Sequence, residues 1–210
     1  IKNPSFEVNV TDSWSLDGLA TASQDSDVSS SAYSGANSAK IIGTGAWTYT
    51  SNTAPVVSGN YYTFSAYVKT NASLTVEFIG RDSLGNYLET HTHTFAATTD
   101  WARITATTLV DALEPDLATY EMKLSGDSGT FYIDCVQLEK SPTATDYFDA
   151  SLPSTYGVIW EGTSDNSYSH LYYSKSLKIR RVAETLVDWL PMNCWWRIKT
   201  YAGVEYTNPV

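Results

Sequence analysis

Short strand-like segments separated by turn residues make up the first 140 residues of this chain. Aromatic and β-branched residues concentrate in four of these segments, at 61–69, 74–79, 101–110 and 130–138, and such residues favour strands. Gly and Asn turn signals lie between them, at 58–60, 84–86 and 126–129. No apolar period of helical length runs through this part of the chain. The pattern therefore predicts an all-β fold, an antiparallel β-sandwich or barrel.

Alternation within the segments predicts which side chains point into the core, because successive residues of a strand face opposite sides of a sheet. Two sets are uniformly apolar and are predicted to point inward: Tyr62, Phe64, Ala66 and Val68 in one segment, and Leu74, Val76 and Phe78 in the next. Their alternates mix polar and aromatic residues and are predicted to point outward. In the run 46–51, Trp47 and Tyr49 share one face.

Charge and composition exclude several classes of function. The formal net charge of −10 opposes binding of nucleic acid, which requires an excess of Lys and Arg, and of an anionic membrane surface. No window approaches 18 apolar residues, so no transmembrane helix and no membrane insertion are predicted. The chain begins without an initiator Met or an apolar signal region, which we interpret as a piece of a longer protein. Only Cys135 and Cys194 are present, too few for a disulfide framework.

The pattern changes near residue 140. A linker-like stretch occupies 141–145, and a helical apolar spacing follows from about 176 until Pro191 ends it; residues 195–201 then have the pattern of a strand. Basic residues crowd the start of this helix, opposite to the preference of the helix dipole. We therefore predict two units, a β-sandwich at 1–142 and a C-terminal docking or assembly segment at 143–210. The segment is expected to pack against another chain or domain, or to fold back onto its own sandwich.

Several short motifs occur in a fixed order over the first unit. They are Asn3-Pro4-Ser5-Phe6-Glu7, Trp14, the run 33–38 (YSGANS), the run 58–65 (SGNYYTFS), Trp101-Ala102-Arg103, and the run 132–139 (YIDCVQLE). In this order and spacing the chain resembles the jelly-roll carbohydrate-binding modules of families 4, 9 and 22. The resemblance implies a galactose-binding-like jelly roll that binds glycans, and it assigns Trp14 and Trp101 to packing.

A second resemblance covers the stretch that follows. Gln137-Leu138-Glu139, the run 144–149 (ATDYFD), the run 160–163 (WEGT) and Ser167-Tyr168-Ser169 resemble minor tail proteins of actinobacterial siphophages, in which a sugar-module-like domain commonly precedes such a stretch. Ala150 stands where that pattern has Gly. This resemblance implies a virion protein at the extracellular tail tip, with other tail proteins as partners and a possible homotrimer.

The module resemblance also implies a structural calcium ion. It places ligands at Glu7 and at Asp134. Calcium takes six to eight oxygens, so backbone carbonyls near 34–38 would have to contribute. The alternative for these residues is a pair of exposed acids, or a hydrogen bond from a neighbouring turn.

A sugar-binding face needs aromatic rings that stack on the C–H patches of sugars and polar groups that bind the hydroxyls. The candidates are Trp47, Tyr49, Tyr67 and Tyr87 as rings, with Glu77, Arg81 and Gln24 as polar partners. The alternative is that about half of these pack in the core or at strand edges. His91 and His93 alternate on one segment, and without a third ligand we interpret them as an exposed pair.

No motif of catalysis is present: there is no nucleophile elbow, no HExxH and no phosphate loop. The sequence therefore predicts a non-catalytic glycan-binding module of a phage minor tail protein, which attaches the tail to host cell-surface polysaccharide. Two alternatives stay open: a structural tail protein whose jelly roll no longer binds sugar, and a module appended to a polysaccharide-degrading enzyme.

Overall fold

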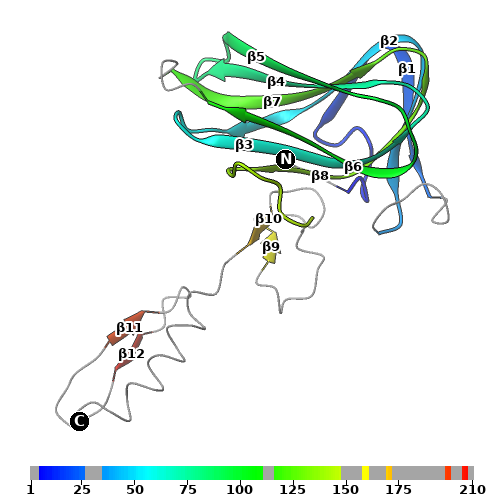
Figure 1. The fold of residues 1–210 in the computed structure, drawn as a ribbon. Coiled ribbons are helices and arrows are strands. Elements are labelled where there is room, and N and C mark those ends of the chain that lie inside the picture. Colours follow the sequence, from blue (N-terminus) through cyan, green and yellow to red (C-terminus); the bar gives the residue numbers. More distant parts are fainter. Residues whose placement is uncertain are drawn as a thin grey trace.

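The computed structural model describes residues 5–26, 35–110 and 116–147, and beyond them only the backbone of four short strands. The helix predicted over 176–190 lies outside the described residues. In the described part the chain is built from β-strands, as Figure 1 shows, which confirms the all-β prediction. No helix long and apolar enough to cross a membrane occurs among the residues that the structure describes.

The strands of the first unit are long and follow one another closely. They are β1 (Trp14–Asp25), β2 (Ser38–Pro55), β3 (Tyr61–Thr70), β4 (Leu74–Asp82), β5 (Tyr87–Phe95), β6 (Thr98–Leu109), β7 (Leu117–Gly126) and β8 (Gly129–Glu139). The later strands form two small antiparallel pairs, β9 (Val158–Trp160) with β10 (Ser169–Leu171) and β11 (Arg197–Lys199) with β12 (Glu205–Thr207). Strand β11 falls within the strand predicted over 195–201.

Eight antiparallel strands are joined in one hydrogen-bonded order, β5-β4-β7-β2-β8-β3-β6, with β1 along β2. Strand β2 pairs with β8 through residues 39–43 and with β7 through residues 47–55. It therefore belongs to two layers, which Figure 1 shows above and below the core: β5, β4 and β7 in one, and β8, β3 and β6 in the other. We call these the first layer and the second layer. Together they form a nearly closed antiparallel sandwich.

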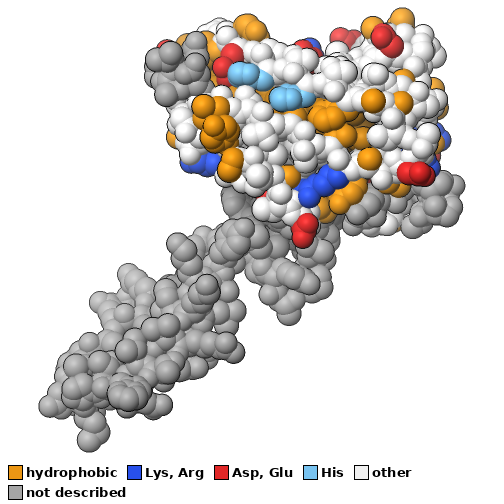
Figure 2. Space-filling model, in the orientation of Figure 1, with side chains coloured by type: hydrophobic (Ala, Val, Ile, Leu, Met, Phe, Trp, Pro, Cys, Tyr) orange, Lys and Arg blue, Asp and Glu red, His pale blue; other side chains and the backbone are white. Residues whose placement is uncertain are grey.

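Alternation in the strands predicted the core correctly. All four inward residues of β3 and all three of β4 are buried, and their side chains join one hydrophobic cluster between the layers. Burying a large apolar side chain of this kind contributes about 1.5–3 kcal/mol. The alternate residues of β3 are at least partly exposed except Thr63 and Ser65, which are fully buried, so the outward prediction did not give their burial. The face seen in Figure 2 is a mixture of uncharged polar and hydrophobic atoms with scattered charges.

The described chain continues past β8 as a short return segment, residues 140–147. The Thr63 hydroxyl of β3 donates to the carbonyl of Ser141 at 2.7 Å. The Glu139 carboxylate accepts the backbone N–H of Thr145 at 3.0 Å and its hydroxyl at 2.6 Å. These contacts hold the segment against the outer face of the second layer. The predicted unit boundary at 142 falls within it and stays a prediction.

Candidate functional site

The outer face of the first layer is built from residues that alternate with the core. Along β4 these are Thr75, Glu77, Ile79 and Arg81, which alternate with the buried residues from Leu74 to Gly80. The six residue steps of an antiparallel strand from Thr75 to Arg81 span about 20 Å. The expectation that Thr75, Glu77 and Ile79 point outward is confirmed by this burial pattern. The face therefore offers a surface of about the length of a short oligomer.

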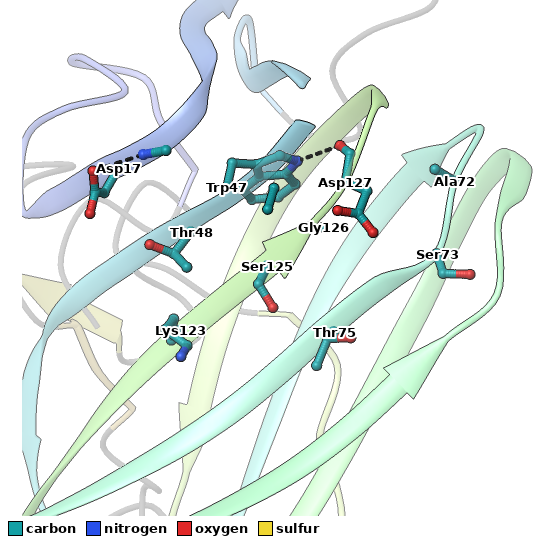
Figure 3. A pocket seen from close by; sticks show the side chains of 12 residues that line it. Asp17, Trp47, Thr48, Ala72, Ser73, Thr75, Lys123, Ser125, Gly126 and Asp127 are labelled. Carbon is teal, nitrogen blue, oxygen red and sulfur yellow. Dashed lines mark hydrogen bonds between the residues drawn. The ribbon is translucent and has the colours of Figure 1, made fainter. Parts of the chain in front are cut away.

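One row of polar side chains, four hydroxyls and one carboxylate, crosses this face from strand to strand. The register pairs Asp17 of β1 with Thr48 of β2, Thr48 with Ser125 of β7, Ser125 with Thr75 of β4, and Thr75 with Thr94 of β5. Figure 3 shows the first four side chains of this row. The hydroxyls of Thr75 and Thr94 are 3.2 Å apart. Each hydroxyl can both donate and accept a hydrogen bond, so the row matches a ligand that carries many hydroxyls.

The first four residues of the row, from Asp17 to Thr75, line a groove of about 630 Å³. Its floor is formed by these four residues together with Lys123. Its end is formed by Ala72 and Ser73 of the β3–β4 turn and by Asp127 of the β7–β8 turn (Figure 3). A volume of this size lies within the range of small-molecule sites in proteins, roughly 300–1,000 Å³. The groove is therefore the candidate ligand site of the described residues.

Two ion pairs lie next to the polar row. Lys123 of β7 and Glu77 of β4 are cross-strand partners, and Nζ lies 2.6 Å from Oε2. Further along, Nη2 of Arg81 lies 2.7 Å from Oε2 of Glu121, while Nη1 of Arg81 donates to the Gly85 carbonyl at 3.2 Å. All four side chains are partly exposed. The pairs fix charged donors and acceptors on the face, as a binding surface requires.

Of the aromatic candidates, Tyr87 lies on this face. It is the cross-strand partner of Arg81 and is 61% exposed. The structure thus brings three predicted residues, Glu77, Arg81 and Tyr87, to one face. Tyr87 is at the opposite end of β4 from the groove, so it can contact only a ligand that extends along the whole face.

The expectation that Trp47 is an exposed stacking ring is wrong. Trp47 is 2% exposed and packs edge-on against Phe131 with ring centroids 4.8 Å apart. Its indole N–H donates to the Asp127 carbonyl at 3.0 Å (Figure 3). A Cβ added at Gly126 would lie 3.0 Å from the indole, so the glycine leaves room for the ring. Trp47 therefore supports the end of the groove from beneath and offers no face to a ligand.

The same expectation is wrong for Tyr49, which is fully buried. Its ring stacks on Trp14 at 4.9 Å, which confirms the packing role of Trp14, and its hydroxyl donates to the Val10 carbonyl. Burial raises the pKa of Tyr49. Trp47 and Tyr49 do share a face, as predicted, but it is the inner one, because β2 presents its threonines outward.

The remaining two candidates lie away from the groove. Tyr67 faces outward from the second layer, paired in register with Arg103 and Asp134. Gln24 lies in the part of β1 that pairs with residues 38–43 of β2, and its amide donates to the Phe6 carbonyl at 2.5 Å. Neither side chain lines the groove. The seven candidates therefore do not form one site.

The carboxylate of Glu7 caps a turn. It accepts the backbone N–H groups of Ala36 and Asn37 at 2.9 and 3.1 Å, and the Asn37 side-chain amide at 3.0 Å. Asp134 is fully buried, and its Oδ1 accepts the Cys135 N–H at 2.7 Å. Within the described residues no group of three or more His, Cys, Asp or Glu could hold a metal ion. Two carboxylates fall short of the oxygens that calcium takes, so the calcium site stays a prediction.

Sequence reasoning missed most of the groove. Asp17, Thr48, Ser125, Lys123 and Asp127 come from strands and turns far apart in the chain, and only the register brings them together. One signal was present: β5 alternates threonine with histidine over 90–94. The threonines extend the outer rows, whereas His91 and His93 are half-buried on the inner side, opposite Phe78 and Val76. The histidine interpretation as an exposed pair is thereby corrected.

A sandwich with a groove on one sheet face, lined by hydroxyls and paired charges, belongs to the class of β-sheet ligand-binding modules. Residues 1–130 match the CBM 4/9 family of carbohydrate binding domains, and the chain belongs to this family. The match confirms the predicted module class for the first unit, and the family is one of non-catalytic binding domains. A search of curated protein sequences gave no match.

Solved structures share the fold at low sequence identity. The enzymatically active domain of bacteriophage CBA120 tailspike protein 4 has a TM-score of 0.55 at 17% identity, covering 66% of this chain and 21% of that one. The CBM22-1 xylan-binding domain of Paenibacillus barcinonensis Xyn10C has a TM-score of 0.50 at 18% identity, covering 67% and 93%. The arabinose-bound α-L-arabinofuranosidase MgGH51 has a TM-score of 0.51 at 18% identity, covering 66% and 26%. At these identities the likeness establishes the fold.

Proposed function

We propose that the groove on the first layer binds a glycan, and that this jelly-roll module attaches a phage tail to polysaccharide of the host surface. The observation that carries the proposal is the polar row of Asp17, Thr48, Ser125 and Thr75 that lines a groove of about 630 Å³ in a member of a carbohydrate-binding family. Sugars present many hydroxyls in fixed directions, and a rigid row of donors and acceptors on strands recognises them without conformational change.

The recognition is expected to rest on hydrogen bonds more than on stacking. Hydroxyl and carboxylate groups line the floor of the groove, while the exposed ring of Tyr87 lies about 20 Å along the face from the Thr75 position. Each hydrogen bond to a neutral group contributes only about 0.5–1.5 kcal/mol net. Affinity for one module is therefore expected to be weak, and several copies on one tail would raise it through effective concentration.

The test is calorimetric titration and affinity electrophoresis with a panel of polysaccharides, followed by isosteric variants. Thr75→Val and Ser125→Ala remove groove hydroxyls without changing the fold's shape, and together they are expected to weaken binding about tenfold or more. Thr105→Val, an exposed threonine of β6 on the second layer, is the matched control and should bind as wild type. Binding unchanged by the groove variants would refute the assignment of the site. Release of reducing sugar by the purified chain would refute a purely non-catalytic role.

The phage setting is supported by the resemblance of 137–169 to minor tail proteins and by the tailspike structure that shares the fold. If the module acts at a tail tip, soluble chain added to host cells should lower phage adsorption, and the Thr75→Val, Ser125→Ala chain should not. Equal inhibition by both chains would refute groove-mediated attachment.

The alternative of a structural module has one observation in its favour. The centre of the face is occupied by two ion pairs, Lys123 with Glu77 and Arg81 with Glu121, which satisfy one another without a ligand. A chain that binds no glycan in the panel, but assembles with other tail proteins, would establish this alternative.

A further inference from the structure

We propose that the outer face of the second layer holds a separate binding site, whose ligand is a saccharide that carries a carboxylate, such as a uronic-acid oligomer. The site consists of three aromatic rings, Tyr67, Trp101 and Tyr132, and three cations, Lys40, Lys69 and Arg103. It lies on the opposite layer from the groove and does not depend on the function proposed above.

Register places these residues side by side on one face. Lys40 of β2 is the partner of Tyr132 of β8, and Tyr132 is the partner of Lys69 of β3. Two residues before Lys69 on β3, Tyr67 is the partner of Arg103 of β6. Diagonal neighbours of this kind are roughly 7–8 Å apart, so the two tyrosines lie close together. All of these side chains are partly exposed.

The cations lie against the rings. Nζ of Lys40 is 5.3 Å and Nζ of Lys69 is 5.9 Å from the centroid of the Tyr132 ring. The guanidinium carbon of Arg103 is 5.8 Å from the centroid of Tyr67. Distances within about 6 Å are those of cation–π contacts. Trp101 adds an edge-on ring 6.5 Å from Tyr132. The rings thus hold the cations in place ahead of any ligand, which lowers the entropy lost on binding.

Two other contacts orient the cations. Asp25 binds the Lys40 ammonium at 2.8 Å, and the hydrogen bond to this carboxylate raises the pKa of Lys40, so the lysine stays charged at neutral pH. Arg103 donates to the Ser65 hydroxyl at 2.9 Å. Another acid of this face, Asp134, is fully buried and accepts the N–H of Cys135. Glu139 at the far end of the face is bound by Thr145. Lys69 and Arg103 are therefore the partly exposed charges beside the rings that can meet an acidic ligand.

Rings and cations together select the class of ligand. Aromatic faces bind the C–H patches of sugars, and a positive group beside the ring binds an acidic substituent. A single-stranded nucleic acid would also stack on aromatic rings, and it carries about the same charge per unit as a uronic-acid oligomer. The membership of the chain in a carbohydrate-binding family makes an acidic oligosaccharide the better match.

The experiment titrates the full chain with trigalacturonate, with neutral xylotriose and with an oligothymidylate. Trigalacturonate is expected to bind more tightly than xylotriose, and its affinity should fall as salt is raised. Tyr132→Leu should weaken trigalacturonate binding about tenfold, and Lys69→Gln should weaken it severalfold. Leu84→Ala, at an exposed side chain of the β4–β5 turn, should leave it unchanged, and Thr75→Val tests whether the ligand lies in the groove instead. Circular dichroism checks that each variant is folded. If Tyr132→Leu does not fold, the binding measured for Lys69→Gln tests the proposal.

Three results would overturn the proposal. One is equal affinity for trigalacturonate and xylotriose; another is unchanged trigalacturonate binding in Lys69→Gln. The third is tighter binding of oligothymidylate than of trigalacturonate, which would make the face a nucleic-acid site. Loss of trigalacturonate binding in Thr75→Val would place that ligand in the groove. If the groove binds no glycan, the results for the second-layer variants still test the second-layer site.

Discussion

Replacing Trp47 by alanine separates a packing role from a binding role. The side chain is 2% exposed, lies against Phe131 and donates to the Asp127 carbonyl. Truncating a buried tryptophan to alanine costs about 3–5 kcal/mol through lost burial and the cavity left behind. The conservative Trp47→Phe keeps a ring but loses the N–H donor, for which we expect a cost of about 1–2 kcal/mol.

The assay is urea denaturation at 25 °C, followed by tryptophan fluorescence and far-ultraviolet circular dichroism. The free energy of unfolding should fall in the order wild type, Trp47→Phe, Trp47→Ala. The matched control is Tyr87→Ala, an aromatic side chain that is 61% exposed and should change the free energy of unfolding by no more than about 0.5 kcal/mol. A Trp47→Ala chain within about 1 kcal/mol of wild type would refute the placement of the ring in the core.

Three further predictions concern other parts of the fold. Burial, together with the charge of His91, lowers the pKa of His93, so the unfolded chain takes up a proton at a higher pH than the folded chain. The free energy of unfolding should therefore decrease from about pH 7 to pH 5, and it should decrease less in His93→Gln. Equal decreases in the two chains would argue against this reasoning. Gly126→Ala places a Cβ 2.9 Å from the Phe131 ring and should cost about 1–3 kcal/mol in urea denaturation; no loss would mean that the turn adjusts freely. Calcium should raise the melting temperature of wild type over that in a chelator but not of Glu7→Gln, and identical melting temperatures would leave Glu7 with its turn-capping role alone.

Strict alternation made the faces of β3 and β4 predictable. In both strands one alternate set is apolar throughout, and an apolar set on a strand has only the core to face. Glu77 and Arg81 could therefore be assigned to the outer surface from the sequence, and the structure places both there. The fold class follows from the same reasoning applied to each segment in turn.

The position of Trp47 and Tyr49 could not be predicted in the same way. Their strand alternates aromatic residues with threonines over 47–50, and either set suits a binding face. Which set is buried depends on the course of β2, which runs from one layer into the other over 18 residues. The groove has the same origin: the row from Asp17 to Thr94 joins five strands, and their register is set by turns and pairings that a single sequence does not reveal.

The continuity of β2 has a mechanical consequence. Because this one strand pairs with β1 along most of its length, with β8 through its first part and with β7 through its second, a pull on Thr48 in the groove is transmitted along a single backbone into both layers. The ladders on either side of β2 would then carry the load in parallel instead of opening one bond at a time. If the module binds a surface under pulling force, the extensive pairing of β2 is expected to raise the force needed to unfold it.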